Sequence, residues 1–144
     1  MATPLDFPAR GKILRIDDGR VVFNPTGSTY ELHLAGKSAE LPAPSPAAVA
    51  VHLRATARKV WTMRSGGNFI TPIFGTPKVI QGRVVYLDDR TMVVHATVPV
   101  IIDLPADGTA YDLINGPVTV GNMVNITLLS GASIEPAQAA SAVR

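Results

Sequence analysis

Apolar and polar residues alternate along much of this chain, which is the spacing of strands with one buried face. The clearest case is the stretch 49–59, in which small or branched apolar residues alternate with polar ones. The alternation breaks at Lys59, where a β-bulge would bring Trp61 onto the face that carries the arginines. Few segments show the helical period of 3.6, so the pattern predicts an all-β protein.

The pattern is repeated. Gly11–Phe23 (GKILRIDDGRVVF) matches Gly82–Val94 (GRVVYLDDRTMVV) at an offset of 71 residues. With one residue deleted, Tyr30–Leu34 then aligns with Val100–Leu104, and in the same order Ala50–Ala55 aligns with Met123–Leu128. Three segments in one order indicate an internal repeat, which determines the architecture.

In each copy the residue pattern predicts a hairpin with an Asp-Asp turn, a third strand, a Pro/Gly-rich connection and a long closing strand. That outline resembles OB-like barrels, which are small five-stranded Greek-key barrels. The pairing of two such units also loosely resembles the tandem molybdate-binding barrels. The oxyanion motif of that family is absent here, so no binding residue is carried over. The expected fold is two tandem OB-like barrels related by about 71 residues.

The repeat divides the chain into five parts. A flexible N-terminus (1–10) precedes the first barrel unit (11–64). An extra hairpin strand and linker (65–81) follow, then the second unit (82–135) and a flexible tail (136–144). The apolar segment Phe69–Gly82 would either brace the seam between the barrels or expose an edge to another chain. Of the two, we favour the brace.

Composition limits the cellular setting. The 144 residues include no Cys, which excludes disulfides, thiolate catalysis and Cys-ligated metals, and fits a cytoplasmic location. The start MATPLDFPAR lacks the features of a secretory signal. A run without charge, Leu113–Ile134, is long enough to span a bilayer, but Asn, Gly and Pro interrupt it. We therefore expect no membrane segment.

Charge is divided unevenly. Residues 1–80 hold ten Lys and Arg against five Asp and Glu, whereas residues 81–144 hold three against six. The balances are +5 and −3, which sum to the net charge of +2. Opposite charges would suit docking of the two halves on each other or on different partners.

No catalytic group stands out. Asp17-Asp18 and Asp88-Asp89 could in principle hold a hard cation, but they fall at predicted hairpin tips, where Asp is favoured for turn chemistry. The three His residues are scattered, and no Ser lies in a nucleophile-elbow context. The expectation is a protein that is not an enzyme, with no catalytic residue, no metal and no cofactor.

One basic constellation suggests binding chemistry. It combines four cations and an aromatic residue along one strand: Arg54, Arg58, Lys59, Trp61 and Arg64. Cations that follow phosphates and a ring that stacks on a base are the needs of single-stranded nucleic-acid binding. The alternative is a solvated face whose Arg stems cover the ring. Because the second half is acidic, we predict a largely buried Trp61, with Arg54 or Arg58 near acids of that half.

Three functions follow, in order of preference. The first is a non-enzymatic binding or assembly module that presents the barrels to a protein partner or to another copy of the chain. The second is single-stranded nucleic-acid binding through the basic strand of Arg54–Arg64. The third is binding of a small anion.

Overall fold

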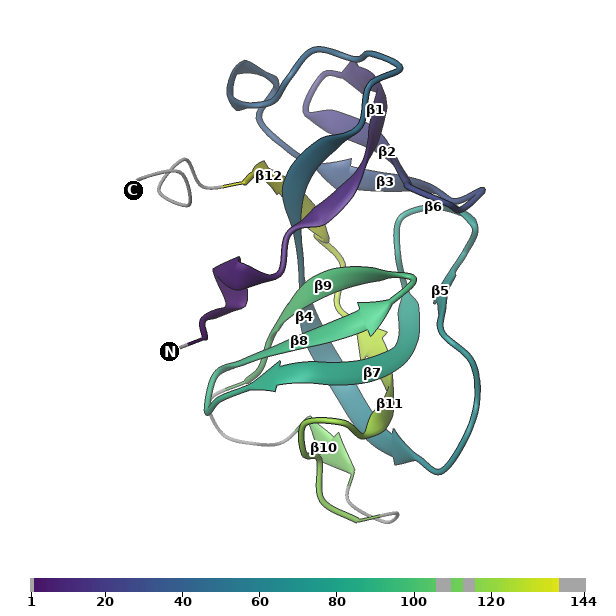
Figure 1. The fold of residues 1–144 in the computed structure, drawn as a ribbon, viewed down its shortest axis with the longest axis vertical. Helices are drawn as coiled ribbons and strands as arrows, with labels where there is room; N and C mark the ends of the chain where they lie inside the picture. Colours follow the sequence, from purple (N-terminus) through teal and green to yellow (C-terminus); the bar gives the residue numbers. More distant parts are fainter. Residues whose placement is uncertain (1, 106–109, 113–115, 138–144) are drawn as a thin grey trace.

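The chain folds into a single large β-sheet. The computed structural model describes residues 2–105, 110–112 and 116–137, and the all-β prediction is confirmed. Neither of the two helices within these residues, the 3₁₀ turns η1 (Pro4–Asp6) and η2 (Ser38–Glu40), is long enough to cross a membrane. Within the described part of the chain, twelve strands join through one network of pairings (Figure 1).

Strands of the first half form one closed ring. They are β1 (Ala9–Asp17), β2 (Arg20–Pro25), β3 (Glu31–Ala35) and the first part of β4 (Val49–Met63). The last strand of the chain, β12 (Ser133–Pro136), inserts between β3 and β4, parallel to β3. Because β1 pairs with both β2 and β4, the order β1-β2-β3-β12-β4 returns to β1. We call this the N-terminal ring.

A second closed ring has the same order of pairings. It contains β7 (Val79–Leu87), β8 (Thr91–Ala96), β9 (Val98–Asp103), β11 (Met123–Leu128) and the later part of β4. Here β4 lies between β9 and β11, parallel to β9, and β11 pairs with β7. We call this the C-terminal ring. The short strand β10 (Tyr111–Asp112) pairs with β4 outside it.

Strand β4 therefore belongs to both rings, and it runs the length of the molecule in Figure 1. The parallel strand of each ring comes from the other half of the chain. In the N-terminal ring it is β12, which follows β11 in the sequence, and in the C-terminal ring it is the later part of β4. The prediction had placed residues 133–135 in the second unit, 82–135, and Pro136 in the flexible tail, of which 138–144 lie outside the described residues. The sequence pattern marks strands and faces, but it does not show which ring a short terminal strand will enter.

The two hairpins β1–β2 and β7–β8 share their irregularities. Each ladder shifts register once, between Ile13 and Arg15 and between Val84 and Tyr86. These positions are 71 residues apart. The same offset separates Gly11 from Gly82, and at both glycines an added Cβ would lie 2.3 Å from a carbonyl oxygen of the partner strand. A close approach of two backbones requires Gly at these positions.

The remaining strands of the two copies match each other two residues away from the positions that the sequence alignment predicted. Val21 pairs with Leu34, and the corresponding Met92 pairs with Ile102, an offset of 68. The reason is the connection: four residues fewer link β8 to β9 than link β2 to β3. A shift of two residues preserves which side chains face inward, so the alternation of apolar residues could not reveal it.

Two segments outside the ring strands, the stretch 1–10 and the stretch that follows β4, make further contacts with the rings. The stretch 1–10, expected to be flexible, holds η1, and β1 begins within it at Ala9. Its Leu5 carbonyl lies 3.1 Å from Nε2 of the buried His52. After β4, β5 (Phe69–Thr71) pairs with β7, and β6 (Phe74–Gly75) pairs with β3. This segment bridges the two rings, as the preferred prediction for it stated.

Candidate functional site

Arg54 is committed to contacts inside the chain. Its Nη1 lies 2.7 Å from Oδ1 of Asp103 on β9, and its Nε lies 3.7 Å from Glu135 on β12. Both acids come from the acidic half, so the predicted approach of Arg54 to acids of that half is confirmed. With its charge paired on two sides, Arg54 is not available to a phosphate in the way the nucleic-acid hypothesis required.

Arg58 and Lys59 are exposed, side by side. The β4–β11 ladder pairs Ala57 with Leu128 and Lys59 with Thr127, so Arg58 is the extra residue of a β-bulge. The bulge was predicted at Lys59, one residue later. Its effect is that two successive cations reach solvent, where a regular strand would turn one of them inward. Arg64, just beyond the end of β4, is also exposed.

Trp61 is half-buried, between the buried and the accessible alternatives. Its neighbours on either side are Asn125 of β11 and Asp112 of β10. The indole Nε1 donates a hydrogen bond to Oδ2 of Asp112 at 3.1 Å. One edge of the ring is thereby fixed to the acidic half, and a carboxylate next to the ring disfavours a phosphate there.

The Asp pairs are turn residues, as predicted. Asp18 and Gly19 both have positive φ, 50° and 84°, the conformation of a two-residue type I′ hairpin. In the second hairpin Oδ1 of Asp88 accepts hydrogen bonds from the backbone N–H groups of Arg90 and Thr91. Asp18 thus forms the first turn through its backbone conformation, and the Asp88 carboxylate closes the second.

Tyr86 modifies the second of these turns. Its hydroxyl donates to Oδ2 of Asp88 at 2.5 Å. A donor to the ionised carboxylate lowers the pKa of Asp88, helped by the two backbone N–H groups, and the same bond raises the pKa of Tyr86. The arrangement stabilises the charged turn at neutral pH.

The described residues contain no candidate metal site, because no three His, Asp or Glu side chains gather there. His33 and His95 lie in β3 and β8, as expected, and His52 is 2% exposed in β4. Among the described residues its Nδ1 has no hydrogen-bond partner, and its Nε2 lies 3.1 Å from the Leu5 carbonyl oxygen. That geometry anchors the N-terminal segment to β4.

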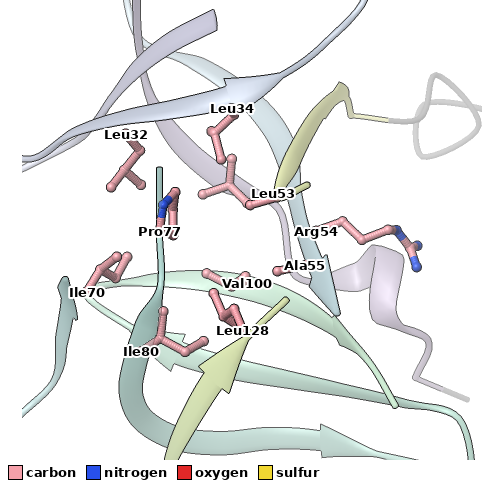
Figure 2. A pocket seen from close by; sticks show the side chains of 11 residues that line it. Leu32, Leu34, Leu53, Arg54, Ala55, Ile70, Pro77, Ile80, Val100 and Leu128 are labelled. Atoms are coloured by element: carbon pink, nitrogen blue, oxygen red, sulfur yellow. The ribbon is translucent and has the colours of Figure 1, made fainter. Parts of the chain in front are cut away.

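Figure 2 shows the apolar contact between the two rings. Leucines from β3, β4 and β11 meet Val100, Ile70 and Ile80 around a cavity of about 10 Å³, and the guanidinium of Arg54 points away from it. Such a space holds at most about one water molecule, and an apolar lining leaves it dry. This seam is a structural core and not a ligand site.

An exposed apolar pair lies on the bridging segment. Phe74 is 63% exposed, the highest value among the large apolar side chains described, and its neighbour Ile73 is 50% exposed. Phe74 begins β6, which among the described strands pairs only with β3, so its other edge is unpaired. From the sequence, Phe69–Gly82 could form an exposed edge, but apolar residues between prolines also fit a buried brace, so the exposure of Ile73 and Phe74 was not predicted.

Comparison with families, with curated proteins and with solved structures finds no match for this chain.

Proposed function

We propose that this chain is a non-enzymatic binding or assembly module built from two OB-like barrels. The two closed rings support the barrel interpretation, because each follows the order 1-2-3-5-4-1 with strands 3 and 5 parallel. Register shifts and close glycines at an offset of 71 support the internal repeat. In this proposal the copies exchange their fifth strands, which makes them one rigid body.

The observation that carries the binding function is the exposed pair Ile73–Phe74. Phe74 is held by strand pairing to Glu31, and the Glu31 N–H donates to the Ile73 carbonyl at 2.9 Å. An aromatic side chain on a fixed backbone can enter an interface at little cost in conformational entropy. Large aromatic side chains of this kind are enriched at the centres of interfaces.

We propose that the partner is a second copy of the chain. The unpaired edge of β6 can face the same edge of another molecule across a twofold axis. The two Phe74 rings would then lie close together, and both edges would be covered. A different protein could occupy the same edge, and it would use the same two residues.

Sedimentation over a concentration series tests the proposal. We expect a mass above that of one chain, and Phe74→Ser should shift the association to at least about tenfold higher concentration, the loss of one interface aromatic. Val120→Ser is the matched control, because Val120 is 60% exposed but lies in the C-terminal ring's loop region. A monomer at every concentration, or equal effects of both variants, would reject self-association through β6.

Nucleic-acid binding is the second candidate, favoured by one observation. The bulge exposes Arg58 and Lys59 together, and neither forms an ion pair within the described residues. Fluorescence anisotropy with a labelled oligothymidine should then show affinity that falls with salt, with a slope of about −0.7 per phosphate contact. Arg58→Gln with Lys59→Gln should flatten that slope, whereas Arg10→Gln on β1 should not.

A further inference from the structure

The outer face of β2 and β3 differs from the matching face of β8 and β9. Val22 pairs with His33 in the N-terminal ring, and the corresponding Val93 pairs with Ile101. Arg20 pairs with Ala35 where Thr91 pairs with Asp103. At matched positions the chain therefore places a cation and an imidazole on one face, and a hydroxyl and an apolar side chain on the other.

The two faces also differ in what covers them. On the C-terminal ring η1 contacts β8, and the ring of Phe7 lies 6.3 Å from that of Tyr86. On the N-terminal ring, two open grooves of about 340 and 320 Å³ flank Arg20 and His33, and both side chains line both grooves. The N-terminal segment therefore covers part of one face, while open grooves border the cation on the other.

Three polar side chains that line the larger groove, those of Arg20, Thr76 and Ser130, have no partners within the described residues. The guanidinium of Arg20 forms no ion pair, although Asp17 and Asp18 lie close in sequence. The hydroxyls of Thr76 and Ser130, which line the same groove, are not engaged in hydrogen bonds among these residues. Four residues with donor side chains, Arg20, His33, Thr76 and Ser130, thus line one groove from different segments of the chain.

We propose that this groove binds a small tetrahedral oxyanion of the phosphate or sulfate type. Arg20 supplies the charge, in a fork that suits two anion oxygens. His33, Thr76 and Ser130 supply further donors, and Gly131, with φ of 99°, lets the β11–β12 connection turn beside them. Asp18 lines the same groove and opposes the anion, which keeps the binding weak and readily reversible.

The site is separate from the surfaces of the proposed function. Ile73 and Phe74 line neither groove, and neither do Arg58 and Lys59. A variant can therefore lose anion binding and keep partner binding, or lose partner binding and keep anion binding.

Titration with inorganic phosphate and with sodium sulfate, followed by amide NMR at constant ionic strength, tests the proposal. We expect saturable shifts at Gly19, Thr76 and Gly131. Arg20→Gln should weaken binding about tenfold, the loss of a charge-assisted hydrogen bond. Asp18→Asn should tighten it several-fold. Asn accepts the positive φ of 50° found at position 18, so this variant should keep the fold.

Arg10→Gln, an exposed arginine on β1 outside both grooves, is the control and should leave the dissociation constant unchanged. Linear shifts without saturation would overturn the proposal. So would equal weakening by Arg10→Gln and Arg20→Gln, because that result means a general effect of net charge. Tightening by Asp18→Asn cannot arise from misfolding, so it separates a lost site from a damaged protein.

Discussion

Nη1 of Arg54 lies 2.7 Å from Oδ1 of Asp103, across the parallel pair β4–β9 that closes the C-terminal ring. Arg54 also approaches Glu135 on β12, the strand that completes the N-terminal ring. The guanidinium of Arg54, on the shared strand β4, therefore connects β9 of the C-terminal ring with β12 of the N-terminal ring. The opposite charges of the two halves are used within the molecule at this point.

A double-mutant cycle of Arg54→Gln and Asp103→Asn measures this bridge. Both side chains are about one third exposed, at 33% and 39%, so screening by solvent reduces the coupling to about 0.5–1 kcal/mol. Urea unfolding of the four proteins gives the value. The pair Arg15–Asp17, at 3.6 Å and more exposed, serves as the control and should couple more weakly. Equal coupling in the two cycles would contradict a special role for Arg54.

The close approach at Gly82 predicts a large effect from one methyl group. A Cβ there would lie 2.3 Å from the His95 carbonyl oxygen and 2.9 Å from Cα of Ala96, which are backbone atoms and cannot rotate away. Gly82→Ala should therefore reduce the free energy of unfolding by about 3 kcal/mol, the upper end for overpacking. Gly67→Ala is the control, since no atom lies within 4 Å of its Cβ position. A stability change below about 1 kcal/mol for Gly82→Ala would show that the hairpin relaxes.

The sequence was most informative where local pattern and structure coincide. Alternation identified the buried face of β4, and the Asp residues of both hairpins marked turns correctly. The pairing of β12 with β3 could not be predicted, because a four-residue strand carries too little pattern to name its neighbours. For the candidate site, Arg54 was rightly placed near acids, whereas the groove at Arg20 and His33 was missed. Those two residues lie on consecutive strands, and the pairing of β2 with β3, which the sequence does not give in detail, brings them to one groove.

The hydrogen bond from Tyr86 to Asp88 predicts a change in titration. Tyr86→Phe removes the largest cause of the lowered pKa of Asp88, so that pKa should rise toward its ordinary value. In the unmodified protein the stabilisation from Asp88 is complete above the unfolded carboxyl's pKa, about 4, and is lost as pH falls through the lower folded value. The variant should lose it at higher pH. Carboxyl NMR titration measures the shift, and Tyr30→Phe, in the other ring, should leave Asp88 unchanged.

The sharing of β4 predicts that the two rings unfold together. Ile134 of β12 is 3% exposed and pairs with Leu53 of β4, so Ile134→Ala should cost about 2–4 kcal/mol by leaving a cavity in the N-terminal ring. Trp61 reports on the other end of β4, in the C-terminal ring. Because β4 cannot leave one ring without opening the other, the loss should appear equally in Trp61 fluorescence and in far-ultraviolet circular dichroism. Leu129→Ala, at an exposed position, is the control and should cost little. Two separate transitions in Ile134→Ala, with Trp61 reporting only the later one, would mean that the rings are independent units that merely touch.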